Sequence, residues 1–163
     1  MKTLKTKHTQ KMRETLMREA ALLAIGVCAG LLCAPRLAKR HALPIRAPGI
    51  KAWRMSKWVK WGGVLRTQGL CGDLAKAATT STAQQTTEAL AKLDAILADA
   101  GLTRANLLAM TIYIRDISPE NFEAMNAVYD QWIDPEHKPT RLCVQAVMGH
   151  EAKVEIRAEA YCP

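Results

Sequence analysis

From about Ile45 to its end, the chain alternates between two hydrophobic periods, one typical of strands and one typical of helices. The stretch KWVKWGGVLRTQG contains two short apolar runs on either side of the Gly62–Gly63 pair. Two glycines between such runs are a signal for a two-residue hairpin turn, so a pair of antiparallel strands is predicted here. Residues 71–80, CGDLAKAATT, show neither period and are predicted to form a loop.

A first helix is predicted to begin at Ser81 or Thr82, because each has a glutamine three residues later, as in a capping box. The apolar positions that follow have helical spacing: Leu90, Leu93 and Leu97. Gly101 is expected to end this helix.

A long strand and a second helix come next. The stretch LLAMTIYIRD alternates cleanly, with Leu108, Met110, Ile112 and Ile114 on one face and Ala109, Thr111, Tyr113 and Arg115 on the other. Ser118 as N-cap, with Pro119 in the first helical position and Glu120 in the first turn, predicts the second helix. Its apolar stripe, which we interpret as core packing, consists of Phe122, Met125, Tyr129 and Trp132.

Two strands close the chain, Thr140 to Val147 and residues 153–161, KVEIRAEAY. The order of elements is therefore ββαβαββ. One mixed sheet that carries both helices on one face would bury the apolar side of every element. The sequence thus predicts an α+β fold.

The composition fits one domain with an N-terminal extension. Of 163 residues, the first 54 hold 12 Lys and Arg against two acidic residues, a net charge of +10. Residues 55–163 hold 11 basic and 13 acidic residues, a net charge of −2, which weighs against a nucleic-acid-binding domain. We expect an extension at residues 1–44 and a folded domain at residues 45–163.

The extension has a basic start followed by an apolar run, Ala20 to Ala34. This run of 15 residues is short for a membrane span, which needs about 20, and has the length of a signal-peptide core. Several readings stay open: a signal or transit peptide, a membrane tether, a disordered leader, or a start that is really Met12 or Met17. We expect a cytoplasmic protein, with export, an organelle or membrane tethering through residues 1–44 as alternatives.

The five cysteines and four histidines show no paired or metal-ligand spacing, so neither a disulfide framework nor a metal site is expected. The candidate for chemistry is Arg141. In the predicted strand HKPTRLCVQAV it shares a face with Cys143 and Gln145, opposite Leu142 and Val144. An arginine at the mouth of a strand needs an anionic partner.

The domain resembles the reactive intermediate deaminase (Rid or YjgF-like) family, and within it the YoaB-like branch. The segments that carry the resemblance are RMS at 54–56, GGVLRTQG at 62–69, QQTTEALAKLDAILADAGL at 84–102, TIYIRD at 111–116, MNAVYDQW at 125–132, PTRLCVQA at 139–146 and VEIRAEA at 154–160. The resemblance implies a chorismate-mutase-like homotrimer, with sheets around a central barrel and pockets between subunits. It also implies cofactor-independent hydrolysis of enamines and imines, such as 2-aminoacrylate and 2-iminopropanoate, to 2-keto acids and ammonia.

The resemblance assigns roles to individual residues. Arg141 matches the arginine that binds the substrate carboxylate, and a guanidinium suits that task because it forms two parallel hydrogen bonds. Glu155 matches the glutamate that positions the attacking water. Cys143 matches a pocket cysteine, to which we assign a lining role. Gln68 stands where the family often has Ser or Ala and is expected to reshape the pocket.

Two further departures concern the pocket. The family's pocket tyrosine has no clear match, Trp53 being the nearest aromatic residue, and the loop MGHEAK at 148–153 is a residue shorter than in the best-known deaminases. Alternatives to an imine deaminase are a non-catalytic carboxylate-binding or holdase-like protein of the same fold, and an RNA-acting protein. The domain charge and the lack of interleaved basic and aromatic residues count against RNA.

Overall fold

The computed structural model describes Met17, residues 41–44 and residues 54–163. Apart from Met17, these residues belong to one unit, Lys39–Pro163. The predictions for the apolar run Ala20–Ala34 and for Trp53 fall outside the described residues. None of the described helices has the length and hydropathy needed to cross a membrane.

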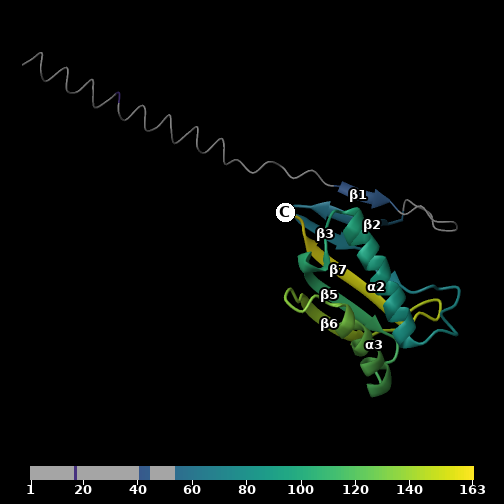
Figure 1. The fold of residues 1–163 in the computed structure, drawn as a ribbon. Coiled ribbons are helices and arrows are strands. Elements are labelled where there is room, and N and C mark those ends of the chain that lie inside the picture. Colours follow the sequence, from purple (N-terminus) through teal and green to yellow (C-terminus); the bar gives the residue numbers. More distant parts are fainter. Residues whose placement is uncertain (1–16, 18–40, 45–53) are drawn as a thin grey trace, which may run out of the picture. The chain divides into compact units, whose positions relative to one another are not determined.

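One mixed sheet lies at the centre of this unit (Figure 1). Its strands are β1 (His41–Pro44), β2 (Ser56–Trp61), β3 (Val64–Thr67), β4 (Leu70–Cys71), β5 (Leu107–Ile114), β6 (Thr140–Gln145) and β7 (Val154–Tyr161). They are ordered β1-β2-β3-β7-β5-β6, and the short β4 also pairs with β7. Only β5 and β6 pair in parallel, because a helix connects them; the other pairs are antiparallel. The predicted ββαβαββ order is confirmed, with β1 and β4 added to it.

The strand β1 lies before Ile45, in the segment that the sequence assigned to the extension. It pairs antiparallel with β2. The domain boundary at residue 45 stays a prediction.

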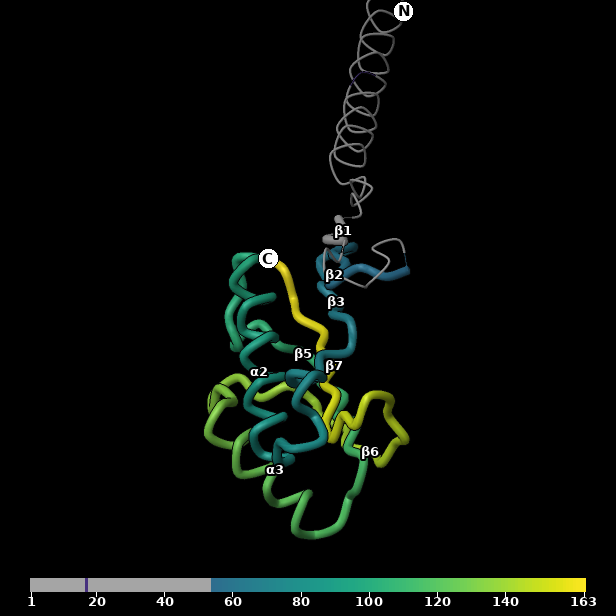
Figure 2. Tube along the Cα trace, turned by 90° about the vertical axis from the view of Figure 1, so that its right-hand side faces the viewer, coloured from purple at the N-terminus to yellow at the C-terminus, as the bar shows by residue number. Residues whose placement is uncertain are grey.

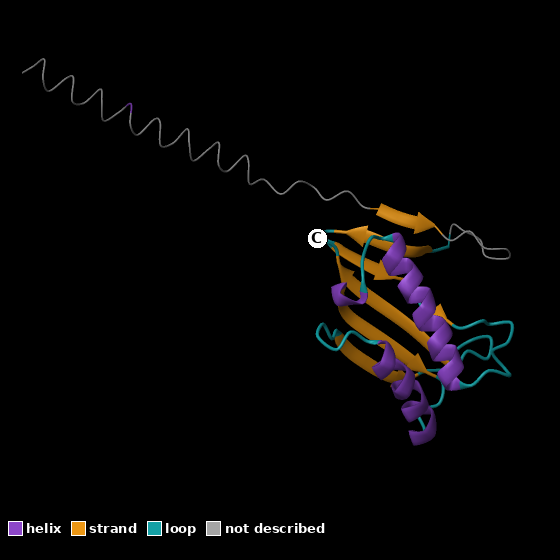
Figure 3. Ribbon diagram, viewed as in Figure 1, coloured by secondary structure: helices purple, strands orange, loops and turns teal. Residues whose placement is uncertain are grey.

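Both long helices cover the same face of the sheet. These are α2 (Thr82–Asp99) and α3 (Pro119–Trp132); a short 3-10 helix, η1 (Arg104–Asn106), precedes β5. Figure 2 shows α2 and α3 together on one side of the strands, and Figure 3 shows them running across the sheet. The opposite face carries no helix in the part of the chain that the structure describes. We call the two sides the helical face and the open face.

Local sequence signals set the ends of these elements. Gly62 and Gly63, with φ of +61° and +76°, form the turn between β2 and β3, as predicted. The Ser81 hydroxyl accepts a hydrogen bond from the Gln84 amide at 3.1 Å, which confirms the N-cap of α2. Gly101, with a φ of +71°, follows the end of that helix.

The predicted core is confirmed with one correction. The leucine stripe of α2 is buried, and so are Met110, Ile112 and Ile114 of β5; all of them belong to one hydrophobic core. Leu108, predicted on that same face, is 47% exposed, whereas Leu107 is 5% exposed. The pairing with β7 shifts register between Leu107 and Ala109, and this bulge turns Leu107 inward in place of Leu108.

The strand predicted to reach Val147 ends two residues earlier, at Gln145. Its partner β5 ends at Ile114, and the last bond between them runs from the Ala146 amide to the Ile114 carbonyl at 2.9 Å. Beyond that point β6 has nothing to pair with, and Val147 is fully exposed.

Candidate functional site

Arg141 lies on β6, which is an edge strand of the sheet, and its side chain belongs to the helical face. In the parallel ladder it is paired with Met110, and Cys143 is paired with Ile112. Paired residues point to the same face, and Met110 and Ile112 are both buried beneath the helices. Arg141 and Cys143 therefore lie next to α3 and not on the open face.

The side chain of Arg141 is held from α3. Its Nη1 donates a hydrogen bond to Asn126 Oδ1 at 2.8 Å, and its Cζ lies 4.6 Å from the centre of the Tyr129 ring. Stacking on an aromatic face orients a guanidinium without neutralising it. Within residues 54–163, no carboxylate lies at ion-pair distance from Arg141.

A cavity of about 530 Å³ opens beside this guanidinium. It is lined by Asn126, Tyr129, Asp130, Ile133, Pro135, Lys138, Pro139 and Arg141. Burial raises the pKa of the Tyr129 hydroxyl, while the positive charge of Arg141 lowers it. The Tyr129 hydroxyl is therefore neutral beside Arg141. The cavity presents two cationic side chains, Arg141 and Lys138, and one carboxylate, Asp130, to an incoming ligand.

Cys143 is half-buried and packs against the hydrophobic core. Burial raises the pKa of its thiol, with the Arg141 charge opposing that rise. A protonated thiol is a poor nucleophile, so the geometry suits the lining role expected from the sequence.

Glu155 lies on the other side of the sheet from Arg141. Its neighbours in sequence, Val154 and Ile156, are fully buried under the helices, so its side chain points to the open face. It is paired across the ladders with Tyr113 of β5 and Cys71 of β4. One chain therefore does not bring its two predicted catalytic residues together.

Gly69 and Gln68 lie beside Glu155. A Cβ atom added at Gly69 would lie only 1.7 Å from Glu155 Oε1. The Glu155 carboxylate therefore occupies the space that a side chain at position 69 would need. Gln68, which is partly buried, donates its backbone N–H to the Lys57 carbonyl at 2.9 Å. The structure thus groups Gln68 with Glu155 on the open face, and Cys143 with Arg141 on the helical face.

Several residues around these groups were not singled out from the sequence. Tyr129 was expected in the core, and it is 7% exposed, but it also stacks on Arg141. Asn126 and Cys71 carried no signal, because only tertiary pairing brings them to Arg141 and Glu155. Burial and the neighbouring Glu155 carboxylate raise the pKa of the Cys71 thiol to about 11, so this thiol is protonated.

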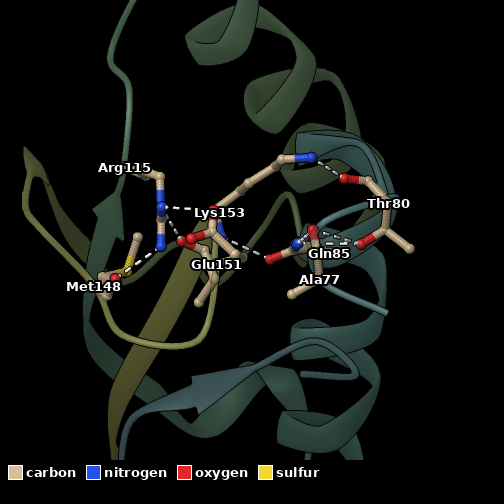
Figure 4. A network of polar contacts seen from close by, with 8 residues as sticks. Ala77, Thr80, Gln85, Arg115, Met148, Glu151 and Lys153 are labelled. Carbon is tan, nitrogen blue, oxygen red and sulfur yellow. Dashed lines mark hydrogen bonds and ion pairs between the residues drawn. The ribbon is translucent and has the colours of Figure 1, made fainter. Parts of the chain in front are cut away.

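A polar network holds the loops on either side of β7 (Figure 4). The buried Gln85 of α2 donates to the Ala77 carbonyl at 2.9 Å and accepts from the Lys153 amide at 2.7 Å. Arg115 donates to the carbonyls of Ala152 and Met148 at 2.8 and 2.7 Å. The short loop 148–153 is therefore fixed from two directions, and so is the start of the strand that carries Glu155.

Comparisons with known proteins agree on one family. The family model described as Endoribonuclease L-PSP matches residues 47–162. The chain is 38% identical over 78 residues to the RutC family protein YoaB of Escherichia coli (strain K12), covering 47% of this chain and 67% of that protein. It is 40% identical over 75 residues to TdcF of the same strain, a relative whose name carries the words reactive intermediate deaminase, covering 44% and 56%.

Solved structures give the same result. NMB1025 of Neisseria meningitidis, a member of the YjgF protein family, matches with a TM-score of 0.67 at 28% identity, over 78% of this chain and 98% of that chain. E. coli TdcF with bound serine matches with a TM-score of 0.59 at 28% identity, over 75% and 94%. The resemblance found in the sequence is thereby confirmed, and the chain belongs to the Endoribonuclease L-PSP family, the YjgF or Rid family.

Proposed function

We propose that the protein hydrolyses reactive 2-imino acids, and the enamines with which they exchange, to 2-keto acids and ammonia. The observation that carries the proposal is Arg141. Its guanidinium is oriented by Asn126 and Tyr129, lines a cavity of about 530 Å³ and has no carboxylate partner within residues 54–163. A substrate carboxylate would supply that partner through two parallel hydrogen bonds.

The chemistry needs water, a fixed substrate and a group that accepts a proton. Water adds to the imine carbon, the C=N electron pair moves to nitrogen, and nitrogen takes up a proton. The hydroxyl of the resulting carbinolamine then loses its proton and its nitrogen gains one, and the C–N bond breaks to release ammonia and leave the carbonyl of the 2-keto acid. In this scheme Arg141 holds the carboxylate end of the substrate, and the Glu155 carboxylate orients the water and accepts its proton.

A site with both groups requires two copies of the chain. Arg141 and Glu155 lie on opposite faces of one sheet, and no second sheet of the same chain covers the open face in the described residues. The outer edge of β6 is unpaired in that part of the structure, so another subunit can approach it there. We infer a homotrimer, in which Arg141 and Cys143 of one subunit meet Glu155, Gly69 and Gln68 of the next.

The separation of Arg141 from Glu155 within one chain also favours a second function, the binding of small carboxylates without turnover. A subunit on its own keeps the Arg141 cavity without Glu155, and that arrangement would bind small carboxylates without turning them over. Hydrolysis of RNA, which the family description suggests, finds little support in a net charge of −2 over residues 55–163.

The test is release of ammonia and 2-keto acid from freshly generated 2-iminopropanoate. A deaminase accelerates release above the spontaneous rate in proportion to protein concentration. Pyruvate binding without any acceleration would show that the protein is a carboxylate binder.

A further inference from the structure

A second cavity, of about 440 Å³, lies on the open face beside Glu155. Its walls include Ser56, Gln68 and Gly69, together with two arginines, Arg66 and Arg157. Neither arginine took part in the site described above. Two guanidiniums around one cavity call for an anionic occupant.

The positive charge of this cavity is only partly balanced. Arg66 uses its Nε–H to bind Glu159 Oε1 at 2.8 Å, across the β3–β7 ladder. Arg157 is exposed and has no ion-pair partner among residues 54–163. One guanidinium and the terminal Nη groups of the other are therefore left for a ligand.

The cavity adjoins the part of the open face that carries Glu155. Arg157 follows Glu155 by two residues on β7, so both side chains point the same way, with Cα atoms about 6.5 Å apart. Gly69, which contacts the Glu155 carboxylate, is also part of the cavity wall. A substrate whose imine carbon reaches Glu155 would extend its side chain toward Arg157.

We infer that the preferred substrate is a 2-imino acid with a second carboxylate on its side chain, which Arg157 and Arg66 bind. The inference rests on the proposed function and adds a substrate class to it. Arg141 of one subunit holds the carboxylate next to the imine, and Arg157 of the other selects the distal carboxylate. A substrate of the same length without that group would leave the Arg157 charge unpaired.

Binding of stable product-like ligands tests the inference without turnover. The matched probes are 2-oxoglutarate and 2-oxopentanoate, which have the same chain length and differ in the second carboxylate. Calorimetry on the full chain should show 2-oxoglutarate binding at least about 10-fold more tightly, the effect of one charge-assisted hydrogen-bonded pair. Arg157→Gln should remove that preference and leave the affinity for 2-oxopentanoate unchanged.

Three controls make the result specific. Lys60→Gln removes one positive charge from β2 on the helical face and should keep the preference. Arg157→Lys keeps the charge and should retain part of it. Inorganic phosphate should compete only weakly, because it lacks the 2-oxo acid end. Any one of three results would overturn the inference. These are equal binding of the two probes by the wild type, loss of affinity for both probes in Arg157→Gln, and competition by phosphate as strong as that by 2-oxoglutarate.

Turnover separates this inference from the function on which it rests. The imines of glutamate and of 2-aminopentanoate can be generated by an amino acid oxidase and their hydrolysis compared. Faster hydrolysis of the glutamate imine, with the difference lost in Arg157→Gln, supports both proposals. Equal hydrolysis of both imines overturns the substrate class and leaves the deaminase intact. Hydrolysis of neither, with 2-oxoglutarate still bound more tightly, overturns the deaminase and supports the assigned anion site.

Discussion

The two faces of the sheet differ in what one chain provides for them. The helical face is covered by α2 and α3 (Figure 2). It holds the hydrophobic core, to which the buried apolar side chains of these helices and of the sheet belong. The open face carries Glu155 and Arg157 next to exposed apolar and aromatic residues, among them Trp61, Leu142 and Tyr161. Side chains of both kinds on an uncovered sheet indicate a surface that another molecule covers. The difference teaches that one chain is enough to bury the helical face, whereas the proposed homotrimer would supply the cover of the open face.

The largest effect should come from placing a charge on the open face. Leu142 of β6 is 56% exposed, and its ladder partner on β5, Thr111, points to the same open face. Leu142→Asp should convert the proposed homotrimer into monomers, because the proposed subunit contact would bury a carboxylate without a partner. Light scattering on the full chain measures the mass, and imine turnover should fall with it.

Leu74→Asp is the matched control, because Leu74 is 45% exposed in the loop before α2. It should leave the trimer intact. A wild-type chain that is monomeric at micromolar concentration would contradict this account of the open face.

Next in size is the loss of Arg141. Arg141 is exposed in one chain, and the proposed trimer would shield it. Arg141→Ala would then remove a bidentate, charge-assisted contact worth on the order of 2–4 kcal/mol. At about 1.4 kcal/mol per decade, kcat/KM for 2-iminopropanoate should fall roughly 30- to 1000-fold. Arg141→Lys should recover only part of this, because an ammonium keeps the charge but loses the planar fork. Wild-type turnover in Arg141→Ala, with the trimer intact, would make the arginine structural.

A smaller effect is expected on the Glu155 side. In Gly69→Ala the new methyl group would lie 1.7 Å from the present position of Glu155 Oε1, so the carboxylate must move. A shift of that size should lower kcat by about 10- to 100-fold. Pyruvate affinity should stay near wild type, because Arg141, which binds the carboxylate, comes from the neighbouring subunit in the proposed site and does not contact Gly69 within its own chain.

Gly149→Ala serves as the control, since its added Cβ meets no atom within 4 Å. Its kcat should equal that of the wild type. An equal loss in both glycine variants would show that the effect of Gly69→Ala is not specific to Glu155.

The smallest effect concerns pH. The pKa of Cys71 rises from 9.0 to about 11 on folding, so the folded state holds this proton more tightly than the unfolded state. The stability it contributes is fully present below pH 9 and is lost between pH 9 and about 11. Urea unfolding at a series of pH values should show a shallower decline over that range in Cys71→Ala. If the free energy of unfolding falls with pH equally steeply in the wild type and in Cys71→Ala, the raised pKa of Cys71 is wrong.

Local sequence patterns predicted most of the elements and buried residues that form the helical face. The glycine pair, the Ser81 N-cap and the two apolar stripes each act through neighbours in sequence, and each appears in the structure. The burial of Leu107 in place of Leu108 was not predicted, because it results from a bulge, and a bulge depends on the register of β5 with β7. A strand of two residues, such as β4, is likewise too short to show a period.

The candidate site was predictable only in part, because the two faces require different information. Arg141 was singled out from the strand pattern, and the family resemblance supplied its role together with Cys143, Glu155 and Gln68. Alternation along each strand showed which residues share a face. The partners of Arg141 on α3 depend on how the helix packs, which the pattern does not contain. The separation of Arg141 from Glu155 depends on which face of β6 and of β7 the helices cover.

Subunit mixing tests the central claim, that Arg141 of one chain works with Glu155 of another. Arg141→Ala and Glu155→Gln should each be nearly inactive alone. Unfolding an equal mixture of the two and refolding it together should restore sites with one intact arginine and one intact glutamate, about a quarter of all interfaces in randomly mixed trimers. The account predicts that imine turnover rises to about a quarter of that of wild type refolded in the same way. Mixed trimers no more active than either variant alone would show that both residues act within one chain, or that they do not share a site.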